Sequence, residues 1–116
     1  MAFQTRDVVE AMIKAGAQPL TELKVDGGAA AMDLLLKLQA DQLGVPVTRS
    51  ATTETTALGA AFFAGLAEEM WSSTDELAGL WRGDPPVEPA ADRRAAEVSY
   101  GRWLEAVERS RGWAPD

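Results

Sequence analysis

The sequence of 116 residues contains neither cysteine nor histidine. Without cysteine the chain can form no disulfide, no thiol nucleophile and no cysteine-ligated zinc site. Without histidine it can form neither a histidine-based catalytic triad nor a histidine-ligated metal centre. Any metal would therefore have to bind the carboxylate oxygens of aspartate and glutamate, which suit magnesium or calcium.

Long hydrophobic runs are also absent, since no apolar stretch approaches the roughly 18 residues of a membrane span. The N-terminal segment does not resemble a signal peptide, because charged residues such as Arg6, Asp7 and Glu10 interrupt it. Acidic residues outnumber basic ones by 18 to 11, which makes nucleic acid and anionic membranes poor partners. We expect a soluble cytoplasmic protein that forms one domain or part of one.

The elements expected from apolar spacing run helix, strand, helix, strand and then helices, an order typical of α/β proteins. Two strands cannot form a well-covered sheet alone, so we expect part of a larger, helix-rich sheet domain. We divide the chain into an α/β core at residues 1–82, an irregular connector at 83–91 and a C-terminal helix at 92–112. The expected helices cover residues 3–15, 29–43, 55–70, 73–81 and 92–111, and the expected strands cover 23–26 and 45–48.

Three of these helices carry more detailed predictions. In the helix over 29–43, Asp33 can pair with Lys37 on the polar side. Ser73 and Glu76 fit a capping box that opens the short helix over 73–81. The apolar faces expected for the helices over 29–43 and 92–111 are Ala31, Leu34, Leu35 and Leu38 in the first, and Ala96, Tyr100, Trp103, Leu104 and Val107 in the second.

The helix over 55–70 is unusually rich in alanine and glycine. Thr52 or Thr53 can cap its start, with Glu54 beside the positive end of the helix dipole rather than acting as a catalytic acid. Gly59 and Gly65 each cost roughly 0.5–1 kcal/mol in a helix, so another part of the protein is expected to approach closely. Tight packing of this helix on the sheet is the favoured explanation, and a direct ligand contact is the alternative.

A pair of glycines follows the first expected strand and precedes a helix. At such a junction, backbone N–H groups point outward and glycine leaves room for a phosphate or a nucleotide. The spacing around Gly27 and Gly28 matches neither the dinucleotide-binding GxGxxG pattern nor a Walker A loop. Asp26, just before the pair, is more often a turn former than a ligand of magnesium–nucleotide, although both interpretations stay open.

Three segments together resemble the C-terminal domain of FGGY carbohydrate kinases. They are AFQTRDVVEAM at residues 2–12, LKVDGGA at 23–29 running on to LQADQLGVPV at 38–47, and ETTALGAA at 54–61 with AGLA at 64–67. The similarity covers most of residues 2–71 and is weaker beyond. The QTRD and ETTALGAA segments favour glycerol kinases over xylulose or gluconate kinases.

The resemblance implies a partial ribonuclease-H-like fold of the actin-like ATPase type, with ATP in a cleft between two domains. It implies magnesium as the companion ion of ATP, and ATP or ADP as partners. The adenosine side of the cleft would fall to Gly27 and Gly28. The family usually has asparagine where this chain has Met32, which can pack against adenine but cannot form the hydrogen bonds of an amide.

The family's sugar-alcohol site, catalytic aspartate and phosphate-binding loop lie upstream of the matching region and have no counterpart in this sequence. Phosphoryl transfer requires both substrates and magnesium to be positioned together. We therefore expect a kinase fragment that is inactive alone and meets glycerol only together with the missing N-terminal portion. The partner would be a complementing kinase fragment or a second copy of the chain. The alternatives are a non-catalytic module that binds a nucleotide or a partner, and a fragment of another FGGY sugar kinase.

Overall fold

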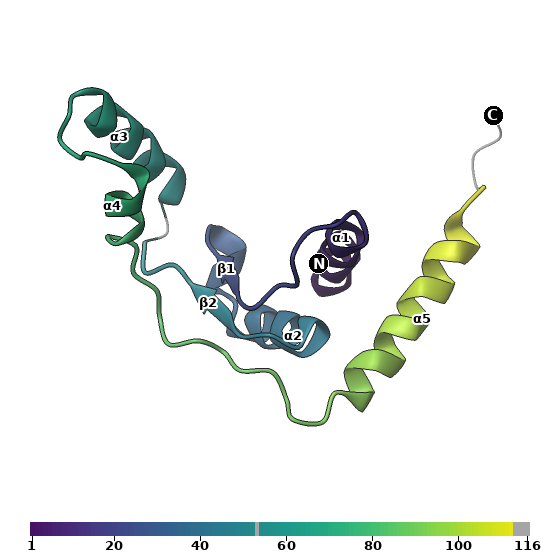
Figure 1. Ribbon diagram of the computed structural model, residues 1–116. Helices are drawn as coiled ribbons and strands as arrows, with labels where there is room; N and C mark the ends of the chain where they lie inside the picture. Colours follow the sequence, from purple (N-terminus) through teal and green to yellow (C-terminus); the bar gives the residue numbers. More distant parts are fainter. Residues whose placement is uncertain (53, 113–116) are drawn as a thin grey trace.

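A computed structural model describes residues 1–52 and 54–112 of the chain. Two short strands and the helices α1 and α2 form its centre, while α3 with α4 and the long helix α5 project from opposite sides (Figure 1). The elements are α1 (Ala2–Lys14), β1 (Leu23–Val25), the 3-10 helix η1 (Gly28–Ala31), α2 (Asp33–Leu43), β2 (Val47–Arg49), α3 (Thr55–Ala67), α4 (Thr74–Ala78) and α5 (Arg94–Ser110).

The two strands pair in parallel, with Leu23 opposite Val47 and Val25 opposite Arg49. Val47 also exchanges two backbone hydrogen bonds with Val87, so the connector runs along the other edge of β2. The α/β organisation with few strands is therefore as predicted. The buried core consists of Leu36, Ala40 and Val47, with Leu23, Val25 and Val87 packed against it.

Helix α2 differs from its prediction at its start. The chain forms a 3-10 turn after the glycines, and Met32 then takes an extended conformation (φ −88°, ψ 101°) before α2 begins. The predicted pair of Asp33 with Lys37 is wrong. Lys37 binds Asp41 at 2.8 Å, while Asp33 accepts from Arg49 at 3.0 Å.

The predicted apolar face of α2 is also wrong, because Leu34 is 71% exposed and Leu38 is exposed too. Two glutamines are buried in their place. Gln39 donates to the Thr5 hydroxyl of α1 at 3.4 Å, and Gln42 donates to two groups of α5 at 3.2 Å. The inner side of α2 thus combines two glutamines with Leu36 and Ala40, and the apolar spacing could not reveal the buried glutamines.

Helix α3 begins at Thr55 without a side-chain cap. Thr52, one of the two predicted caps, instead donates its backbone N–H to the Ser50 hydroxyl, and Thr53 lies outside the described residues. The predicted packing of α3 on the sheet is wrong, because Gly65 is its one buried residue among those described.

The close neighbour of Gly65 is the Trp71 ring, which follows the helix in the chain. A β-carbon at Gly65 would lie 2.1 Å from a carbon of that ring, whereas Gly59 faces open space. Phe62 meets the same ring edge-on with centroids 5.3 Å apart. Gly65 therefore lets the segment between α3 and α4 fold back against α3. At the start of α4, the Ser73 hydroxyl accepts from the Glu76 N–H, which is one half of the predicted capping box. The Glu76 carboxylate accepts from the Ser72 N–H instead of the Ser73 N–H.

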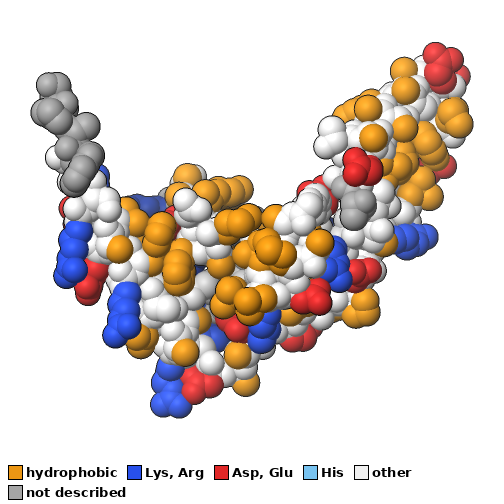
Figure 2. Space-filling model, turned by 180° about the vertical axis from the view of Figure 1, so that it is seen from behind, with side chains coloured by type: hydrophobic (Ala, Val, Ile, Leu, Met, Phe, Trp, Pro, Cys, Tyr) orange, Lys and Arg blue, Asp and Glu red, His pale blue; other side chains and the backbone are white. Residues whose placement is uncertain are grey.

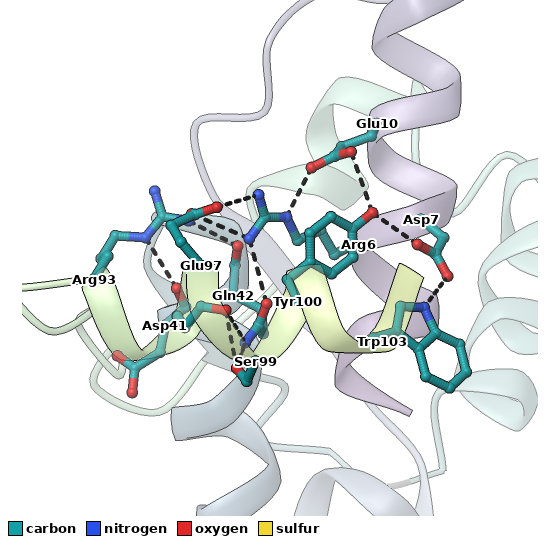
Figure 3. Close-up of polar contacts among 11 residues, drawn as sticks. Arg6, Asp7, Glu10, Asp41, Gln42, Arg93, Glu97, Ser99, Tyr100 and Trp103 are labelled. Atoms are coloured by element: carbon teal, nitrogen blue, oxygen red, sulfur yellow. Dashed lines mark hydrogen bonds and ion pairs between the residues drawn. The ribbon is translucent and has the colours of Figure 1, made fainter. Parts of the chain in front are cut away.

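The first half of α5 lies against α1 through a polar cluster (Figure 3). Asp7 accepts hydrogen bonds at 2.7 Å from both the Tyr100 hydroxyl and the Trp103 indole N–H. Arg6 pairs with Glu97 at 2.8 Å and stacks over the Tyr100 ring. Burial, and then the neighbouring Asp7, raise the pKa of the Tyr100 hydroxyl, which therefore stays protonated and donates.

The second half of α5 projects beyond α1. Leu104 and Val107, which were predicted to face the core, are consequently exposed. The radius of gyration is 17.7 Å, well above the value of about 13 Å for a compact chain of 100 residues. The described part of the chain has no helix that combines the length and apolar character needed to cross a bilayer.

Candidate functional site

The glycine turn, residues 26–31, follows the end of β1 and includes η1. Gly27 has φ 78° and ψ 179°, a backbone conformation that is essentially restricted to glycine. The turn is closed by a hydrogen bond of 3.0 Å from the Ala30 N–H to the Gly27 carbonyl. A β-carbon placed on Gly27 or Gly28 would have no atom within 4 Å. Among the described residues, the space that a side chain at either position would occupy is therefore open.

The glycine turn borders a concavity, which we call the turn hollow, of about 290 Å³. It lies beyond the carboxyl ends of β1 and β2, where open parallel sheets bind their ligands. Pockets for small molecules usually measure about 300–1,000 Å³, so the hollow can hold only part of a nucleotide. Its lining residues are Asp26, Gly27, Ala30, Ala31, Arg49, Ser50, Ala51, Thr52 and Asp84.

The three residues predicted to face the nucleotide are close in the sequence, but only one of them lines the turn hollow. Gly27 lines the turn hollow, whereas Gly28 and Met32 are not part of its lining. The Met32 side chain is 51% exposed at the start of α2. Asp26 lines the hollow and accepts a hydrogen bond from the Thr55 hydroxyl, so its carboxylate links the turn to α3.

Two charged residues of the turn hollow were not predicted from the sequence. Arg49, the last residue of β2, binds Asp84 of the connector at 2.8 Å. Hydrogen bonds first to Asp84 and then to Asp33 raise the pKa of the Arg49 guanidinium. A signal for Arg49 was available, since the residue that ends the second strand lies beside the residue that ends the first. The sequence held no such signal for Asp84, because Asp84 comes close to Arg49 only through the path of the connector.

The turn hollow does not build a metal site by itself. Within residues 1–52 and 54–112, no group of three acidic side chains is placed to hold a metal ion. Of the two carboxylates in the hollow, Asp26 accepts from Thr55 and Asp84 is paired with Arg49. This wall therefore lacks the set of free oxygens that magnesium requires.

Comparison with known proteins shows the family. Residues 1–68 match the model of the C-terminal domain of the FGGY family of carbohydrate kinases. The chain belongs to this family. The FGGY chain is 58% identical over 115 residues to a glycerol kinase of Aromatoleum aromaticum, which covers 97% of the chain and 23% of that protein. It is 50% identical over 113 residues to glycerol kinase 2 of Thermotoga maritima, again covering 23% of the relative.

Solved structures confirm the fold of this FGGY chain. A xylulose kinase from Lactobacillus acidophilus superimposes with a TM-score of 0.82 at 20% identity, over 96% of this chain and 23% of that one. The glycerol kinase of Plasmodium falciparum, solved with ADP, has a TM-score of 0.77 at 29% identity, over 95% of this chain and 22% of its own. The predicted family resemblance and actin-like fold are confirmed, and the FGGY chain spans less than a quarter of these relatives.

Proposed function

We propose that this chain is the C-terminal part of an ATP-dependent glycerol kinase, which transfers a phosphoryl group from ATP to glycerol and gives glycerol 3-phosphate. The observation that carries the proposal is the glycine-only conformation of Gly27 beside an uncovered hollow at the carboxyl end of the sheet. The glycerol kinase relatives support the same activity, since they match nearly the whole chain.

In this proposal the glycine turn forms the wall beside the adenosine of ATP or ADP. Gly27 and Gly28 let the nucleotide approach bare backbone, because neither position is crowded by another side chain. Met32 is exposed next to the turn and can pack against the base through its thioether. The limited volume of the turn hollow fits one side of a cleft whose other side belongs to the rest of the kinase.

Magnesium belongs to the proposal as the companion of ATP. Because the described acidic side chains form no cluster for a metal, the ion would be held by the phosphates and by residues of the rest of the kinase. The chain's own contribution is to bind and orient the adenosine side. We therefore expect no glycerol-dependent release of ADP from the chain alone.

The partner in this proposal is the upstream portion of the kinase. Apolar side chains are exposed on both α1 and α3, among them Val8, Met12 and Phe63. Residues 55–78, which contain α3 and α4, form what we call the α3–α4 arm. Figure 2 shows hydrophobic side chains gathered over this arm and the centre of the molecule. Exposed apolar surface of this kind marks a contact surface, and here it would be covered by the cytoplasmic kinase remainder rather than by a second copy.

A calorimetric titration of the chain with Mg-ATP tests the nucleotide role. We expect micromolar binding that Gly27→Ala weakens, because alanine cannot adopt the backbone conformation of Gly27 without strain. Gly101→Ala in α5, where a β-carbon meets nothing within 4 Å, is the matched control and should bind normally. Absence of binding by the unchanged chain would refute the proposed half-site.

A coupled assay of ADP release tests whether the upstream portion of a glycerol kinase supplies the catalytic residues that this chain lacks. Adding the purified upstream portion of a glycerol kinase should produce glycerol-dependent turnover that neither piece shows alone. Turnover by the isolated chain would contradict the proposal. Formation of a homodimer that excludes the upstream portion would favour a non-catalytic module instead.

A further inference from the structure

Arg49 occupies the end of β2, in register with Val25 of β1. Its side chain therefore starts beside the point where β1 turns into the glycine turn. The guanidinium lines the turn hollow together with Gly27 and Asp84. This placement brings a rigid planar donor to the one segment that the proposed nucleotide site depends on.

The guanidinium connects three separate segments. Its Nη1 donates to the Ala30 carbonyl of η1 at 3.1 Å and to Asp33 at the start of α2 at 3.0 Å. Its Nε donates to Asp84 of the connector at 2.8 Å. The backbone completes the link, because the Asp84 N–H donates to the Arg49 carbonyl at 2.9 Å.

The bond to Ala30 falls on the short glycine turn. The turn is closed by the Ala30 N–H to the Gly27 carbonyl at 3.0 Å and the Met32 N–H to the Ala29 carbonyl at 3.2 Å. Arg49 adds an anchor from outside the turn and fixes it relative to the sheet. The planar fork of arginine suits several partners in fixed directions, which a lysine ammonium does not reproduce.

We propose that Arg49 is a positioning residue that holds the glycine turn against β2 and the connector, and thereby sets nucleotide affinity without contacting the nucleotide. The inference rests on the proposed nucleotide role of the turn. A competing explanation is that the positive charge of Arg49 attracts the phosphates directly. The two explanations predict opposite results for Asp84, because removing its negative charge would strengthen anion binding but would also release the anchored guanidinium.

Binding of Mg-ATP by calorimetry separates the two explanations. Arg49→Met and Arg49→Lys should each weaken binding by about tenfold, and Asp84→Asn should weaken it by a few-fold. The matched control is Arg94→Met, since Arg94 is an exposed arginine that is also paired with an aspartate. Normal binding by Arg49→Lys, or tighter binding by Asp84→Asn, would overturn the positioning role.

Amide hydrogen exchange gives a readout that needs no nucleotide. In Arg49→Met the amides of residues 28–33 should exchange about tenfold faster, while those of α1 keep their rates. Unchanged exchange in this segment would overturn the inference even if ATP binds. Faster exchange together with no ATP binding by the unchanged chain would uphold the anchoring but refute the nucleotide role. Should Arg49→Met not fold, Arg49→Lys and Asp84→Asn carry both measurements.

Discussion

Helices α2 and α3 have similar lengths, yet they are buried in opposite ways. Helix α2 mixes leucines with charged and amide side chains and buries four residues, two of them glutamines. Helix α3 is almost wholly apolar, and Gly65 is its one buried residue among those described. Burial in this chain therefore follows the neighbours that each helix has, and not its apolar content. Helix α2 packs against α1, α5 and the sheet, whereas in the proposed function α3 would be covered by the remainder of the kinase.

The largest expected effect comes from truncating one buried residue on α2. Leu36 is 2% exposed, so Leu36→Ala should lower the free energy of unfolding by about 3 kcal/mol. Phe63→Ala on α3 is the matched change and should stay within about 0.5 kcal/mol, because Phe63 is 72% exposed. Urea unfolding followed by circular dichroism measures both. Equal losses would show that α3 has a partner within the chain.

A smaller effect should come from the contact that holds α5. Asp7→Ala removes the acceptor of the Trp103 indole and the nearer of the two acceptors of the Tyr100 hydroxyl, which also donates to Glu10, and should cost about 2 kcal/mol. Asp92→Ala is the control, since Asp92 is an exposed carboxylate that bonds, among the described residues, to the side chain and backbone N–H of Arg94 alone. The unfolding free energies of the two variants make the comparison. A loss as large in Asp92→Ala would contradict the role given to Asp7.

Met32 offers a test at the start of α2. Met32→Asn and Met32→Ser should each stabilise the chain by about 1 kcal/mol, because both supply the side-chain cap that this helix lacks. Only asparagine also supplies an amide, so only Met32→Asn should tighten Mg-ATP binding, by a few-fold. Thermal unfolding and calorimetry measure the two effects. Equal affinities of the two variants for Mg-ATP would contradict the proposal that residue 32 contacts the base.

The smallest expected effect is a dependence on pH. Hydrogen bonding to Arg6 lowers the pKa of Glu97 below its ordinary value of 4.5 in the folded chain. The contribution of Glu97 is therefore present above about pH 4.5 and is lost as the pH falls through the lowered pKa. The urea midpoint of the unchanged chain should exceed that of Glu97→Gln at pH 7 and converge with it in acid. A gap that does not narrow as the pH falls below 4.5 would contradict this.

The sequence was sufficient to predict the strands and the glycine turn, because each depends on neighbouring residues. Gly27 and Gly28 end a short apolar strand, and such a pair favours a turn whatever lies around it. The inward side of α2 was not predictable, because Gln39 and Gln42 find their partners on α1 and α5, far away in the sequence. The anchor of the turn depends likewise on Arg49 meeting Asp84, which only the folded connector brings about.

The Trp71 ring packs directly against Gly65, and this contact bears on how the chain would assemble with the rest of a kinase. Because this local closure uses only residues of the α3–α4 arm, the arm is already shaped before any partner covers its apolar surface. A preformed surface loses less conformational entropy when it binds. The remainder of the kinase would thus bind an apolar surface that is already formed. A side chain added at Gly65 would displace the Trp71 ring, disturb this surface and slow assembly.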